Sequence, residues 1–115
     1  MSRRPVEKIV RDLVDACDAA AELVDRGREA FDRDRMLRLA AEAIIGRIGD
    51  AAAKLRERAE VELPRSIPWD DVVANRIVVD HVYHRVDYGA LWNTLQHDVP
   101  TLSSALRTWA ESLDE

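Results

Sequence analysis

The first stretch that restricts the fold covers residues 5–26, where apolar side chains recur every three or four positions over several turns. This spacing is typical of an amphipathic α-helix, because it gathers the apolar side chains on one face. Pro5 suits the start of such a helix and Gly27 suits its end. The apolar positions are Val6, Ile9, Val10, Leu13, Val14, Cys17, Ala20, Ala21 and Val24.

The same period recurs further along the chain. A second long helix is expected over residues 34–60, with Gly46 and Gly49 inside it. Glycine in a helix interior costs up to about 1 kcal/mol relative to alanine. These two glycines therefore indicate either the close approach of a neighbouring helix or the wall of a groove. The charged stretch "REAFDRDR", residues 28–35, is predicted to be a connection between the first two helices.

The second half of the chain contains the signals for three more helices. The third begins at residue 66 or 67, with Pro68 in its first turn, and continues to about residue 83. Asp87 is a good N-cap for a fourth helix, and Pro100 is expected to open a fifth.

Composition supports the same fold class. The 115 residues are 47% apolar but only 5% aromatic, with four glycines and four prolines, which is too few for a turn-rich β-fold. The length suits one core. We therefore expect residues 1–115 to form a single all-α domain, an antiparallel bundle of four to five helices.

Net charge and cysteine content indicate which partners and which cellular compartment suit the chain. The net charge of −5 disfavours a general, sequence-independent coat for nucleic acid, which needs a basic face. The single cysteine, Cys17, excludes an internal disulfide and fits a reducing compartment. No segment approaches 18 apolar residues, and the N-terminus shows no signal-peptide pattern. A cytoplasmic protein without membrane contact is expected.

Residues 76–87, "RIVVDHVYHRVD", place polar side chains in a segment that is apolar nearly all round. Arg76, Asp80 and Tyr83 share one stripe of a helix, spaced i, i+4, i+7. One interpretation is a surface ion pair between Arg76 and Asp80. The other is a site, because a charged group on a buried helix must be paired or lie in a cleft. Arg76 and His81 are about 140° apart on an ideal helix. They converge only if the helix ends near Asp80 or a second subunit closes the site.

Two further patterns admit an alternative interpretation. His81 and His84 form an H-x-x-H pair, but zinc needs three or four ligands, and only His97 and Cys17 remain as further nitrogen or sulfur ligands. No metal site and no cofactor are therefore expected. The three tryptophans, Trp69, Trp92 and Trp109, occupy apolar helix positions, which favours core packing over a platform for base stacking.

Five ordered elements of the chain resemble one family. Arg76, His81 and Tyr83 form R-x4-H-x-Y, the pattern of HepT-like toxins in the HEPN ribonuclease superfamily. The segments "GDAAAKL" (residues 49–55), "IPWDDV" (67–72), "VDYGALW" (86–92) and "DVPTL" (98–102) are similar to other elements of that family. The resemblance covers roughly residues 35–109 and implies a HEPN-like helical bundle.

The resemblance also implies an activity and partners. It implies metal-independent cleavage of an RNA substrate in the cleft of a homodimer, with His81 as proton acceptor or donor and Arg76 stabilising charge on the phosphate. In HepT-like systems a nucleotidyltransferase antitoxin of the MntA type attaches AMP to the motif tyrosine. Tyr83 occupies that position, so it is both a catalytic candidate and the expected AMP acceptor. His84 is a supporting candidate near the RNA path.

The chain departs from the family pattern at two positions. Ile77 stands where most relatives have asparagine, and Asp80 stands where they usually have an apolar residue. Asp80 is a candidate to support Arg76 or His84. The loss of a polar group at Ile77 keeps an alternative function open. In that alternative the chain is a catalytically silent dimer that binds a nucleotidyltransferase as an adaptor.

Overall fold

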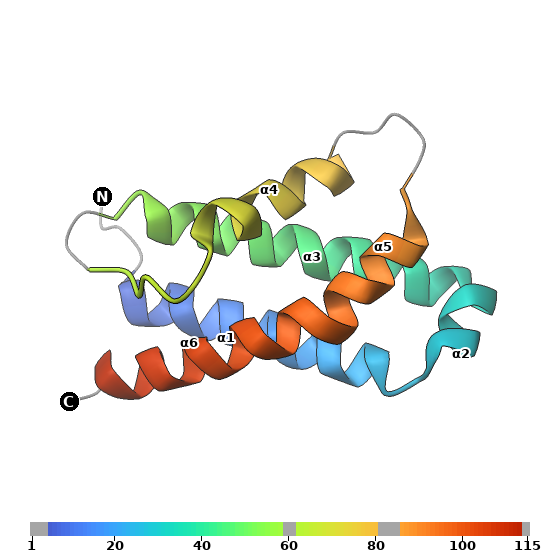
Figure 1. Cartoon of the computed structure of the whole chain (residues 1–115), viewed down its shortest axis with the longest axis horizontal. Helices are drawn as coiled ribbons and strands as arrows, with labels where there is room; N and C mark the ends of the chain where they lie inside the picture. The colour runs from blue at the N-terminus through green and yellow to red at the C-terminus, as the bar shows by residue number, and fades with distance from the viewer. Residues whose placement is uncertain (1–4, 59–61, 81–85, 114–115) are drawn as a thin grey trace.

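The computed structural model describes residues 5–58, 62–80 and 86–113, with the backbone alone for residues 75–80. Every regular element in these residues is helical, which confirms the predicted fold class (Figure 1). The long helices run antiparallel: α1 (Val6–Val24), α3 (Arg35–Arg56), α4 (Trp69–Asp80) and a C-terminal helical run that ends with α6 (Val99–Leu113). The closely packed pairs among them are α3 with α4, α1 with α3, and α1 with α6.

The core follows from the apolar stripes of these helices. From α1 it takes Val6, Ile9, Val10, Leu13, Ala16, Cys17, Ala20 and Leu23, which confirms most of the predicted face of the first helix. Of the other predicted positions, Val14 and Val24 are half-buried and Ala21 is exposed. Gly27 follows α1 with φ of 90°, a conformation that residues with a Cβ rarely adopt. Gly27 therefore ends the first helix as predicted.

The connection predicted for residues 28–35 is wrong for most of its length, because residues 28–33 form α2 (Arg28–Arg33). Pairs four residues apart stabilise this short helix, Arg28 with Asp32 and Arg33 with Glu29. Its one buried side chain, Phe31, is fully buried against residues from the other end of the chain. Tertiary burial therefore makes a helix of a stretch whose charge alone indicated a loop.

Two helix boundaries also differ from the expectation. The second long helix ends at Arg56, earlier than the predicted residue 60, with Glu57 as its C-cap. The third begins at Trp69, so Pro68 precedes its first turn and lies outside it. The carbonyl of Pro68 accepts the first bond of α4 from the Val72 amide at 3.0 Å. Residues 81–83, the predicted end of this helix, lie outside the described residues.

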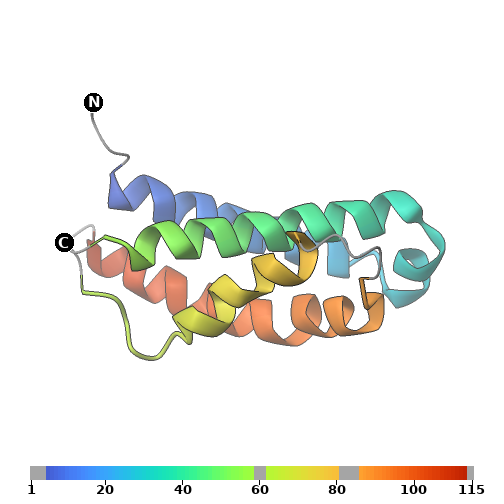
Figure 2. The same ribbon diagram turned by 90° about the horizontal axis from the view of Figure 1, so that it is seen from above.

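The predicted fourth and fifth helices are one helical run. It consists of α5 (Tyr88–Asn93), the π-helical turn η1 (Thr94–Asp98) and α6 (Val99–Leu113) (Figure 2). Pro100 was expected to open a helix but lies inside this run. Proline lacks an amide donor, and its ring clashes with the carbonyl four residues earlier. The wider π-turn accommodates Pro100 without breaking the helix.

The two glycines of α3 differ in their surroundings. A Cβ added at Gly46 would meet no described heavy atom within 4 Å, so close approach of a neighbour does not explain this residue. Gly49, one turn later, is buried. Neither glycine lines a described groove, so the groove interpretation stays a prediction.

Candidate functional site

The helix that carries the predicted motif is anchored at its start. The indole Nε1 of Trp69 donates a hydrogen bond to the Pro64 carbonyl at 3.0 Å. Its ring meets Trp109 of α6 edge-on, with centroids 5.9 Å apart. Arg56 at the end of α3 pairs with Asp70 at 2.6 Å. These contacts tie the first turn of α4 to both neighbouring helices.

The motif residues lie at and beyond the other end of α4. The backbone places Arg76 and Asp80 one helical turn apart, as their spacing predicted. Only the backbone is described there, so the structure does not test whether their side chains pair. His81, Tyr83 and His84 lie outside the described residues. Their roles stay predictions.

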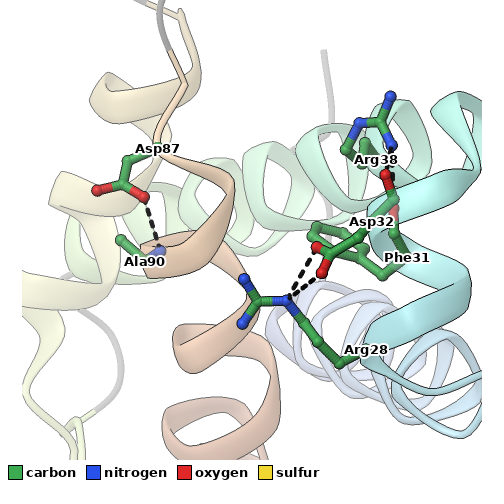
Figure 3. A network of polar contacts seen from close by, with 6 residues as sticks. All are labelled: Arg28, Phe31, Asp32, Arg38, Asp87 and Ala90. Carbon is green, nitrogen blue, oxygen red and sulfur yellow. Dashed lines mark hydrogen bonds and ion pairs between the residues drawn. The ribbon is translucent and has the colours of Figure 1, made fainter.

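The chain that re-enters the structure after the motif is held by polar contacts (Figure 3). The carboxylate of Asp87 accepts a hydrogen bond from the Ala90 amide at 3.0 Å, which confirms Asp87 as the N-cap of α5. A Cβ added at Gly89 would lie 3.7 Å from a guanidinium nitrogen of Arg28, whose Nε pairs with Asp32 at 2.9 Å. Helix α2 and the start of α5 are therefore neighbours.

A polar pair that the sequence did not predict lies beside this segment. Tyr88 donates a hydrogen bond from its hydroxyl to the Glu42 carboxylate of α3 at 2.7 Å. That bond, followed by partial burial and the negative charge of Glu42, raises the pKa of Tyr88 above its usual value. The guanidinium carbon of Arg38 lies 5.7 Å from the centre of the same ring. The 46 positions between Glu42 and Tyr88 carry no periodic signal that links them.

Arg38 has a structural partner as well. One of its guanidinium nitrogens donates to the carbonyls of Phe31 at 3.1 Å and Asp32 at 2.6 Å (Figure 3). Those carbonyls lie at the C-terminal end of α2, where backbone acceptors lack partners within the helix. A cation at this position also complements the helix dipole. The N-terminal half of α3 is thus bound to α2 through Arg38 and to α5 through Glu42.

The other candidate residues that the structure describes are part of the core. Trp69, Trp92 and Trp109 are buried, which confirms core packing over base stacking. Burial, with a smaller contribution from Asp18, raises the pKa of the Cys17 thiol to about 12, so this cysteine is a poor nucleophile. Within the described ranges no three His, Cys, Asp or Glu side chains cluster as metal ligands do. No helix in those ranges has the length and apolarity to cross a bilayer.

Comparison with known proteins decides the family. Residues 13–109 match the family described as "Ribonuclease HepT-like", and this range includes Arg76, His81 and Tyr83. The chain belongs to the HepT-like ribonuclease family. The expected resemblance is thereby confirmed, and membership assigns the chain to ribonucleases of the HEPN type.

Two relatives of this HepT-like protein come from Methanocaldococcus jannaschii. The one named "Putative RNase MJ1380" is 27% identical over 103 residues, which are 89% of this chain and 94% of the relative. The one named "Putative RNase MJ0125" is 22% identical over an alignment of 116 positions, which covers 100% of this chain and 99% of the relative. No solved structure matches the chain.

Proposed function

We propose that this HepT-like chain is the toxin ribonuclease of a toxin–antitoxin pair and cleaves RNA without a metal ion at a site shared by two copies. The observation that carries the proposal is the ordered R-x4-H-x-Y motif, Arg76, His81 and Tyr83, inside the matched range of a ribonuclease family. Helix α4, which carries Arg76, begins at an anchored turn, with Trp69 bonded to Pro64 and its ring edge-on to Trp109.

The proposed reaction uses the ribose 2′-hydroxyl as nucleophile. Its oxygen attacks the adjacent phosphorus, the bond to the 5′-oxygen breaks, and a 2′,3′-cyclic phosphate and a 5′-hydroxyl result. One imidazole accepts the 2′-proton and another donates a proton to the leaving 5′-oxygen, for which an unperturbed pKa of about 6.5 is well suited. Arg76 stabilises the negative charge that develops on the phosphoryl oxygens, because a guanidinium stays charged and binds two oxygens.

A homodimer brings these groups together. On one continuous helix Arg76 and His81 point about 140° apart, so they do not converge on one phosphate. In a two-fold dimer the same patch of both copies meets, and two motifs face one cleft. The two His81 side chains then take the roles of acceptor and donor. Sedimentation at micromolar concentration should give a dimer mass, and a stable monomer that still cleaves RNA would contradict the shared site.

The activity is tested with purified protein and an end-labelled single-stranded RNA. Cleavage should survive EDTA and leave a 2′,3′-cyclic phosphate. His81→Ala should lower the rate by about 10²–10⁴. Arg76→Ala should lower it by a similar factor, by analogy with the loss of one charge-stabilising group. The matched controls are His97→Ala and Arg65→Ala, which change exposed side chains that are not part of the motif.

The results of these cleavage assays distinguish the proposed mechanism from its alternatives. Loss of cleavage on chelation and its return with zinc would replace this mechanism with a metal site at His81 and His84. Equal loss in the controls would assign the effect to folding. No cleavage by any form, with intact dimerisation, would favour the silent adaptor. Ile77 in place of the usual asparagine is the observation that keeps this second function in view.

We further propose that the antitoxin is a nucleotidyltransferase of the MntA type that attaches AMP to Tyr83. The added phosphodiester brings negative charge near Arg76, where it competes with RNA phosphate, and the adenosine fills the cleft. Co-expression followed by intact-protein mass spectrometry should show adenylate-sized increments on wild type and none on Tyr83→Phe. Tyr88→Phe is the control, because Tyr88 is the only other tyrosine and is bonded to Glu42. Increments that persist on Tyr83→Phe would refute the assignment.

A further inference from the structure

One side of the bundle is less closely packed than the others. Helix α4 packs on α3, and α1 packs on α3 and α6, but α4 and α6 are not among the closely packed pairs of the described elements. Between them lies a groove of about 460 Å³. Its walls are the start of α4 on one side and η1 with the first half of α6 on the other, and α3 forms its floor. Figure 2 shows α4 starting beside the C-terminal helical run and diverging from it along its length.

The lining is mostly apolar, with three hydroxyl side chains (Ser66, Thr94 and Thr101) and two carboxylates as its polar members. The apolar members are Ile45, Ile48, Ile67, Pro68, Val72, Val99, Leu102 and Ala105. Asp71 from α4 and Asp98 from η1 stand on opposite walls, and both are exposed. No lysine, arginine or histidine belongs to the described lining, and neither carboxylate forms an ion pair with a described residue. The groove therefore suits an apolar group that carries positive charge at its edges.

The same features disfavour nucleic acid in this groove. RNA phosphates would meet two carboxylates without a compensating cation in the described lining. The N-terminus of α4 attracts anions through its dipole, but Asp70 and Asp71 already occupy its first turn. The groove is thus chemically distinct from an RNA path.

The dimensions suit a helix. The wall from Thr94 to Ala105 covers about three helical turns, or roughly 18 Å at 1.5 Å per residue. A trough between two helices accepts a third helix through apolar side chains spaced i, i+3, i+4 and i+7. We propose that this groove binds an amphipathic helix of a second protein, with its apolar face on Leu102 and Val72 and with lysine or arginine beside Asp71 and Asp98.

The probe for this proposal is a fluorescein-labelled amphipathic peptide of leucine and lysine, about fourteen residues long, followed by fluorescence anisotropy. A peptide with glutamate at every lysine position is its counterpart. The full chain should bind the lysine peptide saturably with one site per chain and should not bind the glutamate peptide. Asp71→Asn/Asp98→Asn should weaken binding about two- to thirtyfold, the range expected for two partly exposed charge pairs.

A second variant tests the place of binding. Ala105→Trp puts a large ring into the groove from a half-buried position and should abolish binding while circular dichroism stays unchanged. The matched controls make comparable changes elsewhere on the surface, Glu22→Gln/Glu111→Gln for charge and Ala40→Trp for bulk. Both should bind like wild type.

Three results would overturn the proposal. One is absence of saturable binding to wild type. Another is equal weakening of peptide binding in the groove variants and the control variants. The peptide would then bind through general attraction to a chain of net charge −5. The third is a change in sedimented mass with Ala105→Trp, because it would assign the groove to a second copy of this chain.

Discussion

The Phe31→Ala substitution tests whether α2 is an integral part of the bundle. Phe31 is the one buried side chain of a six-residue helix, and its exposed fraction is 0%. Its ring lies 5.1 Å from Trp92 and 6.2 Å from Tyr88 between centroids. A helix this short is unstable alone, so its conformation depends on this contact. Removing the ring should release α2 from α5.

The expected loss of stability follows from burial and the cavity that remains. Truncation of a fully buried phenylalanine costs about 3–5 kcal/mol. A domain of 115 residues has a free energy of unfolding of roughly 6–17 kcal/mol. The variant should therefore stay folded at low temperature and melt roughly 10–30 °C lower. Phe31→Leu keeps most of the apolar volume and loses the ring pairs, so its cost should be about 1–2 kcal/mol.

Thermal unfolding followed by circular dichroism measures these shifts. Met36→Ala is the control, because Met36 is 69% exposed on the neighbouring helix and should change the melting midpoint by less than about 3 °C. If Phe31→Ala melts within that margin of wild type, the tertiary anchoring of α2 is refuted. The originally predicted charged connection would then describe residues 28–33 better.

Three further predictions concern single side chains. The raised pKa of Tyr88 means that wild type loses stability as pH rises above about 10, because the unfolded chain then releases a proton that the folded chain retains. Urea unfolding at pH 9 and 11 should therefore show a smaller loss of stability for Tyr88→Phe than for wild type. Cys17, whose pKa burial raises to about 12, should react with iodoacetamide at pH 8 only as the chain unfolds, and labelling at the rate of a free thiol would contradict its burial. Asp87→Ala should cost about 1 kcal/mol in urea unfolding, because the Ala90 amide loses its acceptor, and an unchanged midpoint would show that this cap contributes nothing.

Features that depend on near neighbours in the chain were predictable from the sequence. The apolar stripe of α1, the stop at Gly27 and the N-cap at Asp87 are all observed where expected. Each rests on contacts within about four residues, so the local sequence contains the whole cause. The family was also accessible from the sequence, because Arg76, His81 and Tyr83 stand in order among four other recognisable segments.

Features that depend on distant residues were not predictable in this way. Residues 28–33 form a helix because Phe31 is buried against Tyr88 and Trp92, which lie about sixty positions further along the chain. The C-terminal run continues through Pro100 because the backbone widens to a π-turn, a choice that proline alone does not dictate.

In the candidate site, too, some features follow from the local sequence and others from tertiary packing. The spacing of Arg76 and Asp80 on α4 followed from the sequence, whereas the hydrogen bond between Glu42 and Tyr88 exists only because α3 and α5 meet. The groove between α4 and α6 is likewise a product of how three helices pack, since its lining comes from three separate stretches of chain. Local sequence determines where the long amphipathic helices form and which of their faces are apolar. Tertiary packing alone decides which of those faces meet, because burial and hydrogen bonding between distant residues depend on the whole bundle.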